Sequence, residues 1–160
     1  ELHPRQVGLV FALPASFTEL SWKRKGYWSV YPEDHIGALE GNVKAFNSDL
    51  PISGLAGPSS LPSVPWAFDQ TAAGSNIFRS TKENIYEAVL KSTDGGAFRV
   101  ESDGTQHVRA WVDKDWVYLL VADYINAGKG NFLVSHAKKG YKTFRKGDKV
   151  QGVVHLFFSK

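Results

Sequence analysis

The chain contains no cysteine and no methionine among its 160 residues. Without thiols it forms no disulfide and no thiolate metal site, and a chain of this length buries a sufficient core without such cross-links. The missing initiator methionine indicates a piece of a longer protein. Because this length suits one domain, we expect residues 1–160 to form a single domain excised from a larger chain.

Long apolar runs and a strong charge of one sign are also lacking. No run approaches the roughly 20 apolar residues that a membrane span needs. Residues 1–4 show neither the charged nor the apolar region of a signal peptide. The net charge of +3 is too weak by itself to indicate nucleic-acid binding. We therefore expect neither a membrane nor a nucleic acid as partner.

The familiar catalytic patterns are absent too. Glycoside hydrolysis needs two carboxylates roughly 5 to 10 Å apart, whereas the adjacent Glu33 and Asp34 would point to opposite faces of a strand. The five histidines show no metal-binding spacing, and no phosphate loop or nucleophile elbow occurs. The sequence thus predicts no catalytic residue, no metal and no cofactor.

Short runs with apolar residues at alternate positions predict β-strands separated by turns. The expected strands are 7–13, 20–25, 84–90, 97–101, 107–112, 116–124 and 150–158. The expected hairpin turns are 94–96, 102–104 and 113–115. No long stretch has the 3.6-residue period of a helix, so the chain is expected to be all-β, an antiparallel β-sandwich. Proline, glycine and serine gather in residues 47–74, which we interpret as a long ordered excursion.

One motif resembles a known family. Residues 8–34 read GLVFALPASFTELSWKRKGYWSVYPED, which is similar to the start of the C-terminal domain of family 2 β-galactosidases. There a strand GLxxxLP leads to W-x-G-x-G-P-x-E-N-Y-P-D. Trp22 matches the motif tryptophan, Gly26 its second glycine, and residues 31–32 its Tyr-Pro. Residues 81–83 and the closing strand 150–158 are similar to later parts of that domain.

The resemblance implies an architecture and a context. The chain would be the second half of a supersandwich related to galactose mutarotases, and its parent a bacterial, secreted, periplasmic or cell-surface glycoside hydrolase. The catalytic carboxylates of such enzymes lie in a separate barrel domain of the same chain. The sequence departs from the family at three places. Ser29 and Val30 replace its Glu-Asn pair, and Arg24 replaces the first motif glycine. The late loop 126–139 has no tryptophan.

Aromatic side chains beside polar groups are the best candidates for ligand binding. Sugars present apolar C–H faces and rings of hydroxyls, which suit an aromatic platform flanked by donors and acceptors. Alternation along residues 107–112 places His107, Arg109 and Trp111 on the face away from the core. We predict a sugar site there. In the alternative interpretation Arg109 and Trp111 only stack on a neighbouring strand, and His107 makes an ordinary hydrogen bond.

Further aromatic residues could complete this site. Trp66, on the proline-rich excursion, either plugs the side of the domain or forms a second platform that sandwiches a sugar with Trp111. Tyr27 and Trp28 lie in a predicted turn and are further candidates. Trp22 is expected in the core, and Trp116 is expected to begin a buried central strand.

Basic residues cluster at 23–25 and more loosely over 136–149. Each cluster is either a solvated face or a surface for an anionic polysaccharide such as a sulfated galactan. The function predicted first is a non-catalytic carbohydrate-binding module of a glycoside hydrolase that recognises a galactose-containing polysaccharide. The alternatives are a structural accessory domain that packs on the catalytic barrel, and a small mutarotase-like or lyase-like enzyme with His107 as acid–base.

Overall fold

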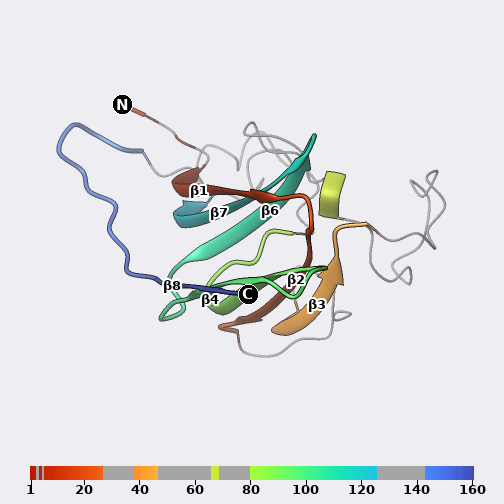
Figure 1. Ribbon diagram of the computed structural model, residues 1–160. Coiled ribbons are helices and arrows are strands. Elements are labelled where there is room, and N and C mark those ends of the chain that lie inside the picture. Colours follow the sequence, from red (N-terminus) through yellow and green to blue (C-terminus); the bar gives the residue numbers. More distant parts are fainter. Residues whose placement is uncertain (3, 5, 27–37, 47–65, 69–79, 126–142) are drawn as a thin grey trace, which may run out of the picture.

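The computed structural model describes residues 1, 2, 4, 6–26, 38–46, 66–68, 80–125 and 143–160. These ranges contain eight strands and one 3-10 turn (Figure 1). The strands are β1 (Gln6–Pro14), β2 (Phe17–Arg24), β3 (Glu40–Lys44), β4 (Ile85–Ser92), β5 (Ala97–Glu101), β6 (His107–Asp113), β7 (Trp116–Ile125) and β8 (His155–Ser159), and the turn is η1 (Trp66–Phe68). In the part of the chain that the structure describes, no helix has the length and apolar character to cross a membrane.

The strands form two antiparallel sheets that pack face to face. One has three strands in the order β1-β7-β6, and the other has five in the order β3-β2-β4-β5-β8. In Figure 1 the three-stranded sheet lies above the five-stranded one. The predicted all-β antiparallel sandwich is therefore confirmed.

Two of the three predicted hairpins are present. Residues 94–96 join β4 to β5, and Gly95 there has the left-handed φ of 95° that glycine adopts without steric cost. The β6–β7 hairpin closes with Asp113 paired to Trp116, and Lys114 in its two-residue loop has a φ of 54°. A left-handed residue matches the twist of the two strands that a short hairpin loop connects.

The predicted hairpin at residues 102–104 is wrong, because this turn connects the two sheets. Strand β5 pairs with β4 and β8, whereas β6 pairs with β7. The Asp103 carboxylate accepts hydrogen bonds from the Thr105 hydroxyl at 2.6 Å and the Thr105 backbone N–H at 3.0 Å. These bonds, led by that of the side chain, lower the pKa of Asp103. Turn chemistry alone does not tell which strand pairs with which.

Several strand boundaries differ from the expectation, and β2, which was expected from residue 20, begins at Phe17. The closing strand was expected from residue 150 but begins at His155. Strand β3 was missed, because its sequence EGNVK holds one apolar residue and two residues that are rare in strands. Val43 of β3 is nevertheless buried in the core. The predicted turn that holds Tyr27 and Trp28 and most of the excursion 47–74 lie outside the described residues.

The main core lies between the sheets and draws on every strand except β8. Its members from the strands are Leu13, Leu20, Trp22, Val43, Ile85, Ala88, Leu90, Phe98, Val100, Val108, Ala110, Val117, Leu119 and Val121. Trp22 is buried as predicted, and its indole Nε1 donates to the Ala38 carbonyl at 3.2 Å. Alternate residues of each strand supply this core, as the period of two requires.

A buried lysine connects the two sheets. Lys82 is fully buried, and its Nζ lies 3.8 Å from the centroid of the Trp22 ring. Its backbone N–H donates to the Val108 carbonyl, and the Val108 N–H donates back to Lys82, at 2.8 and 2.9 Å. A buried ammonium needs a compensating partner, and the face of the Trp22 indole supplies a share of that compensation. Through its ammonium and its backbone, Lys82 therefore contacts both β2 and β6 from the segment before β4.

Trp66 is a core plug, so its predicted alternative as an exposed sugar platform is wrong. It is fully buried in the main core, and its indole Nε1 donates to the Val43 carbonyl at 3.1 Å. The neighbouring Ala67 N–H donates to the Ala45 carbonyl at 3.0 Å. These two hydrogen bonds pair polar groups of η1 with carbonyls in and just after β3. Burial of the apolar indole surface then favours the position of Trp66 in the core.

We predict that Trp66→Ala lowers the free energy of unfolding by about 3 to 5 kcal/mol, the usual loss for a large buried aromatic residue. The matched control is Phe46→Ala, because Phe46 lies two residues after β3 and is half exposed. This control should change stability by no more than about 0.5 kcal/mol. Chemical denaturation of both variants checks the prediction, and equal midpoints would contradict it.

Candidate functional site on the three-stranded sheet

The outer face of the three-stranded sheet carries the predicted site residues of β6. Val108 and Ala110 are fully buried in the core between the sheets. Strand alternation turns His107, Arg109 and Trp111 to the opposite face. The predicted division of this strand into a core side and an outer side is therefore confirmed.

Trp111 is not an open platform, because the outer face has a packed cluster of its own. Only 9% of Trp111 is exposed, and it packs with the buried Leu120 and Ala122 of β7. Its ring stacks on that of Tyr118, which lies directly opposite in register, with centroids 5.5 Å apart and planes 12° apart. The three-stranded sheet thus buries apolar residues on both faces.

Arg109 lies over Trp111 of its own strand, so of the stacking that the alternative interpretation expected on a neighbouring strand, only the Trp111–Tyr118 pair is present. Arg109 is buried, with its guanidinium carbon 5.2 Å from the centroid of Trp111. Its Nη1 donates to Oε1 of Gln6 on β1 at 3.4 Å. Arg109 and Gln6 therefore bridge the outer face from β6 across β7 to β1. A guanidinium held flat against an aromatic ring is a rigid donor group.

His107 holds a turn. Its Nδ1 accepts a hydrogen bond from the backbone N–H of Asn84 at 3.0 Å. Asn84 has a φ of 57°, a left-handed conformation that asparagine tolerates better than most residues. The accepting Nδ1 places the ring proton of the neutral imidazole on Nε2. This is the ordinary hydrogen bond that the alternative interpretation expected, and it fixes the start of β4.

The remaining predicted site residues do not join this face. Trp66 belongs to the main core, on the opposite side of the three-stranded sheet from Trp111. The two indoles therefore cannot sandwich one sugar ring, and that part of the predicted site is wrong. Tyr27 and Trp28 lie outside the described residues.

Trp116 is the site residue that the sequence reasoning missed. It was expected in a buried strand, and β7 does lie at the centre of its sheet, but 48% of Trp116 is exposed. It precedes Tyr118 by two positions and shares its face. Trp111, Tyr118 and Trp116 thus form an aromatic row that runs from the packed cluster to the hairpin end. The signal was its position, directly after the two-residue loop that joins the ends of β6 and β7.

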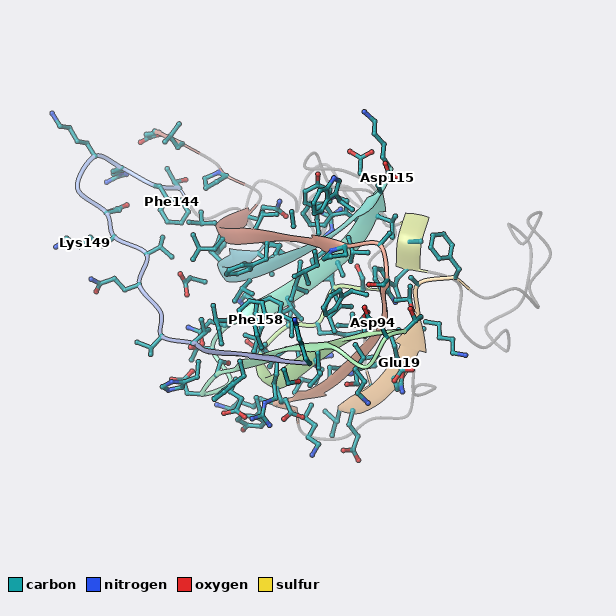
Figure 2. The ribbon with its side chains drawn as sticks, in the orientation of Figure 1. Glu19, Asp94, Asp115, Phe144, Lys149 and Phe158 are labelled. Carbon is teal, nitrogen blue, oxygen red and sulfur yellow. The ribbon has the colours of Figure 1, made fainter. Side chains whose placement is uncertain are left out.

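Polar groups lie beside the exposed end of the aromatic row. The hairpin residues Asp113, Lys114 and Asp115 are all exposed and directly precede Trp116. Figure 2 shows Asp115 at the far end of this hairpin, away from the five-stranded sheet. Two carboxylates and an ammonium next to an indole combine hydrogen-bonding groups with an apolar platform.

Two open hollows elsewhere lack an exposed aromatic residue. One, of about 710 Å³, is lined by Asp103, Thr105, Gln106, Asp123, Val150, Gln151, Gly152 and Val153. The other, of about 480 Å³, lies over β2 and β3 and is lined by Ser21, Trp22, Lys23, Glu40, Gly41, Asn42 and Glu87. Trp22 is buried, so it offers no platform there. Neither hollow includes a predicted site residue.

Of the two predicted basic clusters, 23–25 is fully described and 136–149 only in part. Of the run 136–149, residues 143–149 are described, and Arg145 there pairs with Glu1 at 3.6 Å. In the other cluster Arg24 donates to the Glu83 carbonyl at 3.0 Å, and burial lowers its pKa against the opposing effect of the Glu83 charge. Among the described residues, no group of three or more acidic, histidine or cysteine side chains could hold a metal ion.

The two tryptophans of the aromatic row should differ sharply in their effect on stability. Trp111→Ala should lower the free energy of unfolding by about 3 to 5 kcal/mol, because it empties a packed position. Trp116→Ala should cost less than about 1 kcal/mol, because half of this side chain is already in water. Thermal melting of both variants tests this, and a larger loss for Trp116→Ala would refute the description of the row.

The chain matches no protein-family model, no curated protein and no solved structure. The resemblance of residues 8–34 to family 2 β-galactosidases therefore stays a prediction from the motif alone.

Proposed function

We propose that this chain is a non-catalytic carbohydrate-binding module, the accessory part of a glycoside hydrolase, and that it binds a galactose-containing polysaccharide. The observation that carries the proposal is the exposed end of the aromatic row. There Trp116 is half exposed beside three exposed charged residues of the β6–β7 hairpin.

The chemistry of this end suits a sugar ring. The apolar C–H face of a galactose unit can lie on an indole, while carboxylates accept hydrogen bonds from its hydroxyls. Tyr118, partly exposed and stacked on Trp111, extends the aromatic surface from Trp116 toward the sheet. Buried Leu120 and Ala122 continue the same face of β7 and pack with Trp111. A platform on a packed sheet is rigid, so binding orders few side chains.

We predict that Trp116→Ala weakens binding of a galactan by about ten- to a hundredfold. Loss of an aromatic platform costs roughly 1 to 3 kcal/mol by analogy with base stacking. The matched control is Tyr86→Ala on β4, because Tyr86 is 46% exposed but belongs to the other sheet. Calorimetric titration with a panel of neutral and sulfated galactans measures the affinities, and released reducing sugar is assayed alongside.

Three results would overturn this proposal. The first is equal affinity of Trp116→Ala and the unsubstituted chain. The second is an equal loss in Tyr86→Ala, which would show that the site lies elsewhere. The third is release of reducing sugar, which would show that the chain is itself an enzyme.

We also predict that sulfated galactans bind more tightly than their desulfated forms, and that salt reduces this difference. The predicted basic run 136–149 motivates this preference, whereas the carboxylates of Asp113 and Asp115 beside Trp116 oppose it. Exposed charges are screened over about 8 Å at physiological ionic strength. Lys114→Gln should reduce the preference, because its ammonium is the cationic group of the hairpin beside Trp116. Equal affinities for both forms at low salt would contradict this prediction.

A structural accessory role is the second candidate. The observation in its favour is a set of exposed apolar side chains on β1 and β8, including Leu9 and Phe158. A domain that packs on a catalytic barrel should show such a patch when it is alone. Absence of binding to every glycan in the panel would favour this role over carbohydrate recognition.

A further inference from the structure

The two sheets leave one side of the sandwich open. Strands β1 and β8 are edge strands of their sheets. They lie on the same side of the molecule, because both contact Phe98 of β5. The ring centroid of Phe98 is 5.1 Å from that of Phe11 on β1 and 4.4 Å from that of Phe158 on β8. Figure 1 shows β8 at the edge of the lower sheet.

Apolar side chains line this open side. Leu9 precedes Phe11 by two positions on the same side of β1 and is 66% exposed, and Phe158 is 67% exposed although it stacks on a core residue. All five residues of β8, HLFFS, are exposed. We name the apolar surface of Leu9, Leu156 and Phe158 the open-side strip. Exposed apolar side chains that gather on one side of a domain indicate an interaction site.

Strand β8 also lacks the devices that keep edge strands from pairing. Within its five residues it has no proline, no lysine and no carboxylate, and its pairing with β5 shows no bulge. The other edges are protected. Strand β1 carries a bulge at Val7 and Gly8 and ends at Pro14, and β3 has a charged residue at each end.

The edge of β6 is covered by residues 80–82, which bond to its backbone. Lys82 exchanges two backbone hydrogen bonds with Val108, and the Ser80 hydroxyl bonds to the backbone of Ala110. Among the described strands, β8 therefore presents the edge most open to a further strand.

The free backbone groups of β8 follow from the register. Ser92 donates to the Gly96 carbonyl and Ser102 to the Tyr86 carbonyl, so even-numbered residues of β5 bond to β4. In an antiparallel ladder the odd-numbered residues then bond to the other neighbour. Arg99 pairs with Phe157, so the N–H and C=O groups of Leu156 and Phe158 point away from the sheet.

We propose that β8 pairs antiparallel with β8 of a second copy of this chain, about a two-fold axis that passes through Phe157. In this register Leu156 lies opposite Phe158 of the second copy, and the reverse holds by symmetry. The outward N–H and C=O groups of both residues are then used in hydrogen-bonded pairs. The two five-stranded sheets become one continuous sheet.

The occupant is a second copy because β8 is complementary to itself. The two residues with outward-pointing backbone groups, Leu156 and Phe158, are both apolar and share the face toward the core. Pairing them with each other buries part of both open-side strips at once. No like charges oppose each other within the strand, since His155 lies opposite Ser159.

The first experiment measures the mass of the full chain by sedimentation at increasing concentration, with Leu156→Pro as the variant. The chain should form a dimer. Leu156→Pro removes an N–H that points outward but keeps the ladder to β5, so it should raise the dimer Kd at least about tenfold, which is about 1.4 kcal/mol. Its melting temperature is measured alongside, and Phe158→Lys, which places a charge on the strip, serves if Leu156→Pro unfolds.

The second experiment uses the absence of cysteine in this chain. Phe157→Cys places the only thiols opposite each other in a non-hydrogen-bonded pair, with Cα atoms about 4.5 Å apart, within the range that a disulfide spans. His155→Cys is the matched control, because it lies on the same face but about 13 Å from its copy in this register. Mild oxidation should cross-link Phe157→Cys and leave His155→Cys monomeric on a denaturing gel.

These outcomes decide the proposal without reference to carbohydrate binding. A monomer at all concentrations overturns it and leaves the open-side strip to another partner, as the structural accessory role requires. A dimer in which Phe157→Cys does not cross-link, or His155→Cys does, overturns the pairing about Phe157. A dimer unaffected by both Leu156→Pro and Phe158→Lys overturns the assignment to β8.

Discussion

The structure depends on the packing of the three-stranded sheet against the five-stranded sheet. Phe98, Val108 and Leu119 meet there from three strands and two sheets, all fully buried. Burial of such side chains contributes roughly 1.5 to 3 kcal/mol each, and without it the strands would have only marginal stability. The buried Lys82 adds a second connection, since its backbone pairs with β6 while its ammonium lies on Trp22 of β2.

Unequal sheets have two consequences for the surface. The five-stranded sheet extends beyond its partner, so apolar side chains of β8 face the core side without cover (Figure 2 labels Phe158). On the three-stranded sheet the outer face is packed as well, around Trp111 and Leu120. On this face, the described aromatic residues that a ligand could reach are therefore those at the hairpin end of the row, where the packed cluster gives way to solvent.

The candidate site illustrates how packing competes with function for the same residue types. Tryptophan and arginine are suited to sugar recognition, but a tryptophan stacked on tyrosine with an arginine above it is also a stable outer-face cluster. Around Trp111 and Arg109, neighbouring side chains bury the cluster, so it contributes to stability rather than to ligand contact. At the first residue of β7, beside the hairpin, about half of Trp116 lies in water, and the proposed sugar binding depends on this exposure.

The sequence by itself determined the local features. Alternation gave β6 its two faces, and it placed Trp22 inside. Glycine and polar turn residues predicted the β4–β5 and β6–β7 hairpins, because these signals depend on neighbours along the chain. The resemblance of residues 8–34 to β-galactosidases rests on the sequence motif alone.

Only the tertiary structure decided which strands pair and which side chains are buried. The turn at residues 102–104 crosses between sheets, Trp66 fills the core, Lys82 is buried, and Trp116 is exposed. Each outcome depends on which strands lie beside one another and where each sheet ends. Such contacts join residues far apart in the chain, and a period of two is the same in a strand at the centre of a sheet and in one at its edge.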